Sequence, residues 1–193
     1  KERRKIIANE INSFLIILKE KYISDYQPVE KDWEEIIKQG ENNFLEFKSS
    51  MRWDYNNSIL NKKLEYVIAR TICGFFNSNG GTLFIGVEDN GSILGLENDY
   101  NTLNKKNKDG YQLHLDNVIN NYIGKEYHQF ISIKFISLED KEVCVIEVSP
   151  SSMPAYLNNN GVNEFFIRAS ASTQKLGIKE SIDYINSHWN NNK

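Results

Sequence analysis

The most regular hydrophobic pattern in the chain lies between positions 61 and 76. Its apolar positions, together with one threonine, recur at three- and four-residue steps: Leu64, Val67, Ile68, Thr71, Ile72, Phe75 and Phe76. This spacing places the side chains on one face of an α-helix. Asn61 stands at the N-cap position, and the "NGG" at 79–81 supplies the glycine with which helices often end. The pattern predicts a long helix with one buried face.

Shorter patterns on both sides of this helix predict strands. "NFLEFKS" at 43–49 alternates, as one strand does between its two faces. "TLFIGV" at 82–87 is almost continuously apolar, which is typical of a strand buried on both faces. Asn90 and Gly91 follow as a strong hairpin-turn signal, and we expect the chain to return through 93–96.

The second half of the chain continues with strands. The runs 130–137 and 142–149 are separated by the charged turn 139–141, and this arrangement predicts a β-hairpin. A further strand is expected at 163–168. The polar stretch that follows, 169–175, is interpreted as a loop.

Helical spacing also occurs elsewhere. Residues 2–22 show the apolar seam of an amphipathic helix, and a short second helix is expected at 33–39 after the break at Pro28. Two more helices are predicted, at 111–123 and at 178–188.

Together these elements predict an α+β fold with a mixed, largely hairpin-linked β-sheet flanked by helices. We divide the chain into an N-terminal helix and linker, 1–27, and a core domain, 28–193. The N-terminal helix is expected either to pack on the domain or to pair with a second copy and form a homodimer.

Composition narrows the class of protein. The 193 residues, 40% of them apolar, suffice for one domain with its own core. No run approaches the roughly 18 apolar residues of a membrane span. Cys73 and Cys144 lie in apolar runs without metal-binding spacing, as reduced core cysteines do. We therefore expect a cytoplasmic protein with no membrane partner. Most nucleic-acid-binding domains are basic, whereas this chain has a net charge of −3. The charge counts against a nucleic-acid partner without excluding one.

Three acids are candidates for a metal site. Glu41 and Glu46 are five residues apart, so they meet only if Glu41 lies in a turn after Gly40 and the strand begins later. Asp89 follows the buried strand, at a sheet end where sites are commonly built. Converging carboxylates can hold Mg²⁺ or Mn²⁺, with Lys48 nearby to neutralise a phosphate. The alternative for each residue alone is an ordinary solvated position.

A cluster of hydrogen-bond donors near the C-terminus is a candidate for binding phosphate oxygens. It consists of Arg168, Ser170, Ser172 and Thr173. The equally weighted alternative is a polar loop that caps the last helix. The glycines of "NSNGGT" are not followed by a GxxxxGK[ST] motif, so no nucleotide cofactor is expected.

Four stretches, taken in order, carry a family resemblance over about Trp33 to Leu176. They are "ENNFLEFKSS", "ICGFFNSNGGTLFIGVEDNGSILGL", "VCVIEVSPSSMPAYL" and "FFIRASAST". In order and spacing the chain resembles the Schlafen-type domain, also described as an AlbA-like DNA-binding domain. The resemblance implies a nucleic-acid partner, either RNA or DNA.

In the Schlafen nucleases, the two glutamates of an "ExxxxEFK" motif and the second acid after "IGV" form a metal-dependent site that cleaves structured RNA such as transfer RNA. Those positions match Glu41, Glu46 and Asp89, and Lys48 matches the lysine of the motif. The resemblance therefore implies a metal-dependent endonuclease with Mg²⁺ or Mn²⁺ as cofactor. The nucleases also use a duplicated, U-shaped arrangement with basic walls, which a single copy lacks.

Two alternatives stay open. Many prokaryotic relatives are known as non-catalytic DNA- or RNA-binding modules, and this chain would then belong to a transcriptional regulator or a phage-defence protein. The negative net charge also allows an oligomerisation scaffold that contacts no nucleic acid.

Overall fold

A four-stranded sheet forms the centre of the fold in a computed structural model that describes residues 31–190. Its strand order is β1 (Leu45–Lys48), β4 (Gly81–Ile85), β6 (Lys141–Val148) and β5 (Ile131–Leu138). β1 and β4 are parallel, and the other neighbours are antiparallel. The predicted strand at 43–49 thus pairs directly with the apolar strand at 82–87. Glu46 therefore lies on β1, and Asp89 follows the neighbouring strand β4.

The hairpin of β5 and β6 confirms the prediction made from its two runs. The turn residues Glu139 and Asp140 both have positive φ, 48° and 60°. Such a turn matches the right-handed twist of the two strands that it joins.

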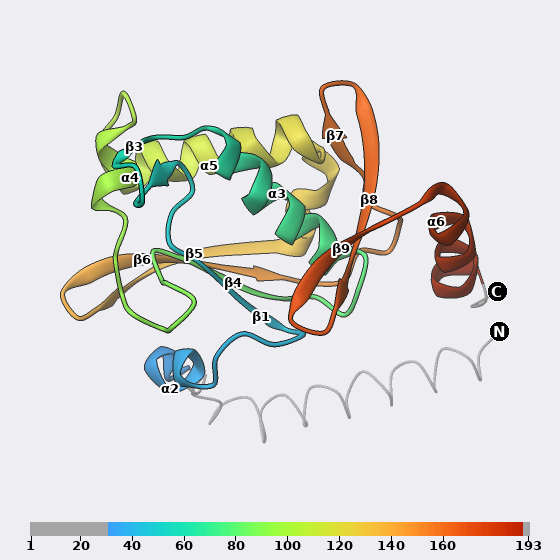
Figure 1. The fold of residues 1–193 in the computed structure, drawn as a ribbon, viewed down its shortest axis with the longest axis horizontal. Coiled ribbons are helices and arrows are strands. Elements are labelled where there is room, and N and C mark those ends of the chain that lie inside the picture. Colours follow the sequence, from blue (N-terminus) through green and yellow to red (C-terminus); the bar gives the residue numbers. More distant parts are fainter. Residues whose placement is uncertain (1–30, 191–193) are drawn as a thin grey trace, which may run out of the picture. The chain divides into compact units, whose positions relative to one another are not determined.

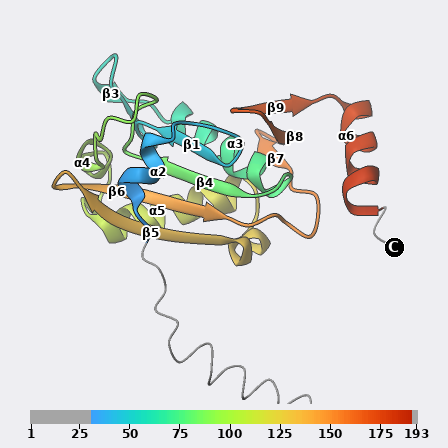
Figure 2. The ribbon, with the colours of Figure 1, turned by 90° about the horizontal axis from the view of Figure 1, so that it is seen from below.

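Helices cover both faces of this sheet (Figure 1). α3 (Lys63–Phe76) and α5 (Lys108–Tyr122) lie on one face, while α2 (Trp33–Lys38) lies on the other, as Figure 2 also shows. α5 begins three residues earlier than expected because Asn107 caps it, its side chain accepting a hydrogen bond from the Gly110 amide at 3.0 Å.

A second, three-stranded sheet has the order β7 (Leu157–Asn159), β8 (Val162–Ala169) and β9 (Ser172–Leu176). The prediction of a loop at 169–175 is wrong over most of its length. β9 pairs antiparallel with β8 and places Thr173 opposite Arg168. The polar residues of β9 suit a strand with one solvent-exposed face. A short polar sequence of this kind is also typical of a loop.

The remaining elements are short. The last predicted helix begins as expected but divides into α6 (Ile178–Ile185) and a π-helical segment, η2 (Asn186–Asn190). The sequence patterns did not predict five further elements: β7, β2 (Trp53–Asp54), β3 (Ile59–Leu60), α4 (Glu97–Asn101) and the 3₁₀ helix η1 (Lys125–Phe130).

The Asn90–Gly91 turn forms, but the strand pair around it is minimal. The Gly91 amide donates to the Glu88 carbonyl at 2.8 Å, and Gly91 has a φ of 87°. Only one bridge follows, between Val87 and Ile93. The expected return through 93–96 is therefore a tight loop that leads into α4.

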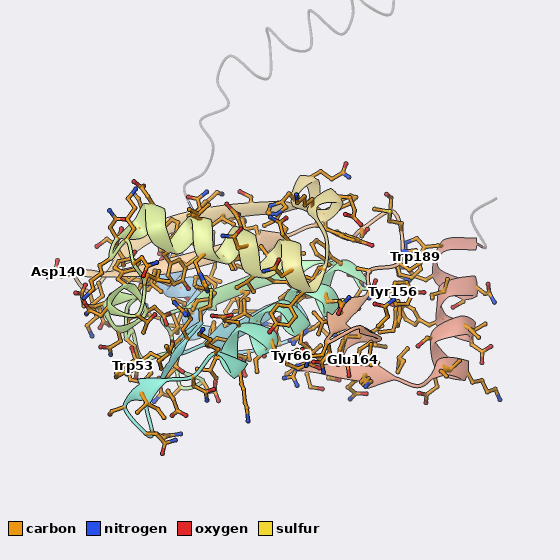
Figure 3. All side chains as sticks on the ribbon, turned by 90° about the horizontal axis from the view of Figure 1, so that it is seen from above. Trp53, Tyr66, Asp140, Tyr156, Glu164 and Trp189 are labelled. Carbon is orange, nitrogen blue, oxygen red and sulfur yellow. The ribbon has the colours of Figure 1, made fainter. Side chains whose placement is uncertain are left out.

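The core lies between the four-stranded sheet and α3 with α5, and most of its side chains come from those elements. Phe165 and Phe166 on β8 are both buried, 3% exposed. Figure 3 shows Tyr66 beside Glu164, where the Tyr66 hydroxyl donates to the carboxylate at 2.6 Å and links α3 to β8.

Asn77, at the C-terminal end of α3, is fully buried and ties this helix to the segment between β6 and β7 and to β8. Its side-chain amide donates to the carbonyls of Ala155 and Phe166, both at 2.8 Å, and its oxygen accepts from the Ala155 amide at 2.7 Å. Its own carbonyl accepts from the Tyr184 hydroxyl of α6 at 2.6 Å. One side chain thus satisfies three buried backbone groups.

The fold is a mixed α+β arrangement, as predicted. Among the described residues, those from Glu34 onward form one compact unit. The predicted N-terminal helix, 1–27, lies outside the described residues. Among the helices of the described residues, none has the length and apolar character needed to span a membrane.

Candidate functional site

Glu41 and Glu46 come together at the start of β1. Gly40 adopts a φ of 71°, which a glycine accepts without strain, and turns the chain after α2. The strand begins only at Leu45, and the Glu41 side chain reaches back to it, where Oε1 accepts a hydrogen bond from the Phe47 amide at 2.8 Å. This bend is the one that the spacing of the two acids requires.

Lys48 lies between the two carboxylates. It projects from the same face of β1 as Glu46, two residues earlier. Its Nζ is 2.6 Å from Oε1 of Glu46 and 3.7 Å from Oε1 of Glu41, and it also donates to the Phe47 carbonyl. The Lys48 side chain remains 22% exposed, so this cluster reaches the surface.

A second cation, Arg168 on β8, closes the cluster from the other sheet. Its Nη1 is 2.7 Å from Oε2 of Glu46 and 3.1 Å from the Thr173 hydroxyl, while Nη2 donates to the Asn42 carbonyl at 2.8 Å. The guanidinium also lies 4.9 Å from the centre of the Phe75 ring. With a side chain only 2% exposed, Arg168 is a buried cation with several fixed partners.

We refer to Glu41, Glu46, Lys48 and Arg168 as the four-charge cluster. It contains two carboxylates and two cations, so its formal charge is zero. Glu46 is buried, 8% exposed, and each of its oxygens contacts one of the cations. A buried carboxylate is stable only with such partners, because burial removes its hydration.

Asp89 does not join the four-charge cluster. It is exposed, and it lines a separate open cleft of about 480 Å³ together with Trp53, Asp54 and Tyr55. Within residues 31–190 no three His, Cys, Asp or Glu side chains lie close enough to share one metal ion. In this arrangement the predicted ligands do not fit Mg²⁺ or Mn²⁺, because cations already contact both oxygens of Glu46.

The predicted phosphate-binding residues of the β8–β9 hairpin divide into two groups. Ser170 and Ser172 are exposed at the turn, where Ser170 has a φ of 55° and the Ser172 hydroxyl donates to the Ala169 carbonyl at 3.0 Å. Arg168 is buried as a member of the four-charge cluster, and the Thr173 hydroxyl accepts a hydrogen bond from it. The hairpin turn therefore places two hydroxyl groups at the surface beside a neutral ionic cluster.

The cysteines take no part in a reactive site. Cys73 and Cys144 are both buried and free. Burial raises the pKa of the Cys73 thiol to about 12, and it raises the pKa of Cys144 as well. Neither thiol is ionised near neutral pH, which agrees with their prediction as core residues.

Comparisons with known proteins agree with this fold. The family model described as "Schlafen, AlbA_2" matches residues 41–177. No curated protein matches. A solved structure, the DIP2311 protein from Corynebacterium diphtheriae, is similar with a TM-score of 0.53 at 18% identity, over 75% of this chain. The chain spans only 27% of the length of that structure, and the likeness concerns the fold alone. The match of the family model includes the four-charge cluster and the four-stranded and three-stranded sheets, and on this basis the chain belongs to the Schlafen AlbA_2 family.

Proposed function

We propose that this domain binds nucleic acid, with the four-charge cluster and the turn of β8–β9 at its binding surface. Membership of the Schlafen AlbA_2 family supports a nucleic-acid-related role. The observation that carries the proposal is the charge balance of the cluster, in which Lys48 and Arg168 compensate Glu41 and Glu46.

The charge balance matters because phosphates are repelled by uncompensated carboxylates. Two bare glutamates at this surface would exclude a nucleic-acid backbone, whereas a neutral cluster with a partly exposed lysine does not. The hydroxyl groups of Ser170 and Ser172 are donors of the kind that bind phosphate oxygens. Because the whole chain carries a charge of −3, binding must come from such local groups.

Metal-dependent cleavage of RNA or DNA, which the resemblance implies, stays a prediction. A divalent ion at Glu41 and Glu46 requires Lys48 and Arg168 to withdraw first, and Asp89 to approach. When bound, such an ion would polarise a phosphate or a water molecule. The contacts of Lys48 and Arg168 with Glu46 favour binding over cleavage.

The test uses labelled transfer RNA and single- and double-stranded DNA, each incubated with the protein in Mn²⁺ or in chelator. We expect retention that persists in chelator and that is weakened by Lys48→Ala but not by Lys179→Ala, which removes an exposed lysine on α6. No retention of any of the three nucleic acids would contradict the proposal. Manganese-dependent cutting that is lost in Glu46→Gln would add catalysis to binding.

A further inference from the structure

A second cleft lies beside α3, α4 and α5, and it involves none of the residues of the four-charge cluster. It has a volume of about 490 Å³. Its lining consists of cationic, amide, hydroxyl and apolar side chains, with one glycine: Arg52, Leu60, Lys62, Thr102, Leu103, Asn104, Lys105, Gly110, Leu113, His114 and Asn117. No carboxylate lines it, which is notable in a chain with more acids than bases.

The backbone that carries Arg52 is fixed by a buried acid. Asp99 on α4 is 2% exposed, and its carboxylate accepts hydrogen bonds from the amides of Met51, Arg52 and Trp53 at 2.9 to 3.1 Å. The Ser50 hydroxyl donates to the same carboxylate at 2.6 Å. Trp53, labelled in Figure 3, marks this loop. Four donors on one buried carboxylate make a rigid loop.

The side chain of Arg52 is held as firmly as its backbone. The residue is 6% exposed, and Nη1 donates to the carbonyl and the hydroxyl of Thr102, both at 3.2 Å. Nε lies 2.8 Å from Oε1 of Glu65 without pointing its hydrogen at that oxygen, so the contact is an ion pair rather than a hydrogen bond. Within the described part of the chain, no hydrogen bond engages Nη2.

Further cations surround Arg52. Lys62 and Lys105 are exposed at the cleft, and the Lys105 ammonium is 2.9 Å from Asp109. His114 is held by Glu65, with Nε2 at 2.9 Å from Oε1. Burial pushes the pKa of Glu65 upward, but the hydrogen bond and charge of His114 and the charge of Arg52 outweigh it, so this pKa lies below its ordinary value. Glu65 therefore stays ionised and orients both neighbours from behind the cleft.

We infer that this cleft binds a phosphate group of a nucleic-acid strand, an inference that rests on the proposed function. The Arg52 guanidinium is held in place and, within the described residues, keeps the two N–H groups of Nη2 free of hydrogen bonds, which suits a phosphate ligand. Lys62 and Lys105 add positive charge on flexible side chains. The amides of Asn104 and Asn117 supply further donors, and the exposed side chains of Leu60 and Leu113 suit the apolar faces of sugar and base. The absence of lining carboxylates excludes a cationic ligand.

The test measures the fluorescence anisotropy of labelled transfer RNA and of a labelled single-stranded DNA, as a function of NaCl concentration. Lys62→Ala/Lys105→Ala removes two phosphate contacts. For single strands, each contact contributes about 0.7 to the slope of log K against log salt, so the slope should fall by about 1.4 and affinity at 0.1 M salt by about 25-fold.

The matched control is Lys38→Ala/Lys179→Ala. It also removes two exposed lysines, one of them from an exposed ion pair, but outside the cleft. We expect no change of slope in the control. Arg52→Lys keeps the charge and loses the planar fork, so it should weaken binding and leave the slope unchanged, while circular dichroism verifies that it folds.

Equal slopes and affinities in the two double variants would overturn the inference about the cleft and leave nucleic-acid binding intact. Failure of the unmodified protein to bind either probe would instead overturn the proposed function. Competition by poly-glutamate as strong as by unlabelled transfer RNA would also overturn the inference, since it would identify an acidic protein as the ligand.

Discussion

Replacing Arg168 by methionine should strongly destabilise the domain. Arg168→Met keeps much of the side-chain length but leaves Oε2 of Glu46, the Asn42 carbonyl and the Thr173 hydroxyl without their common donor. Removing one member of a buried ion pair costs about 3 to 5 kcal/mol, because the remaining charge stays buried and unpaired. Lys48 still contacts Oε1 of Glu46, so we expect the lower end, about 3 kcal/mol.

Urea unfolding with linear extrapolation measures this change. For a domain of this size, about 3 kcal/mol corresponds to a fall in Tm of roughly 6 to 12 °C. Lys38→Met is the control, since it breaks the exposed ion pair with Glu35 and should alter the free energy of unfolding far less.

A double variant tests whether the cost arises from the pair. In Glu46→Gln/Arg168→Met the four-charge cluster no longer contains a buried carboxylate, so the loss of stability should be smaller than the sum of the single losses by at least about 1 kcal/mol. A free energy of unfolding of Arg168→Met within about 0.5 kcal/mol of the unmodified protein, or single losses that simply add, would refute the role of this ion pair.

Two other changes test separate parts of the fold. Asn77→Ala leaves backbone groups of Ala155 and Phe166 unpaired in the core and should lower the free energy of unfolding in urea by about 3 kcal/mol. Asn79→Ala, at an exposed site, is the control and should lower it little. Equal losses in the two variants would contradict the role of Asn77 in pairing these backbone groups. The pKa of Glu65 is lower in the folded state, so its contribution to stability is present above about pH 4.5 and is lost as the pH falls further. Glu65→Gln should therefore reduce the difference between urea midpoints at pH 7 and pH 3.5, and an unchanged difference would contradict this.

The sequence patterns predicted the elements whose signals are local. The helix at α3, the β5–β6 hairpin and the buried strand β4 each carry their own periodicity or turn residues, and all three form. β9 was missed because its pairing with β8, and not its own composition, makes it a strand. Local pattern has no means of distinguishing such a strand from a polar loop.

The candidate site was predictable only in part, for the same reason. The meeting of Glu41 and Glu46 follows from their spacing and from Gly40. The burial of Glu46 does not, because its partner Arg168 is 122 residues away in the sequence. Arg168 was predicted as a donor to phosphate oxygens, and its burial against Glu46 was not foreseen.

The position of Asn77 has a consequence for how the domain unfolds. The Asn77 side-chain amide bonds to the segment between β6 and β7 and to β8, and its backbone carbonyl accepts from Tyr184 of α6. Neither β8 nor α6 can therefore separate from the end of α3 without breaking these bonds. Slow hydrogen exchange should occur with a common free energy at the centres of α3 and β8, as expected of a single cooperative unit.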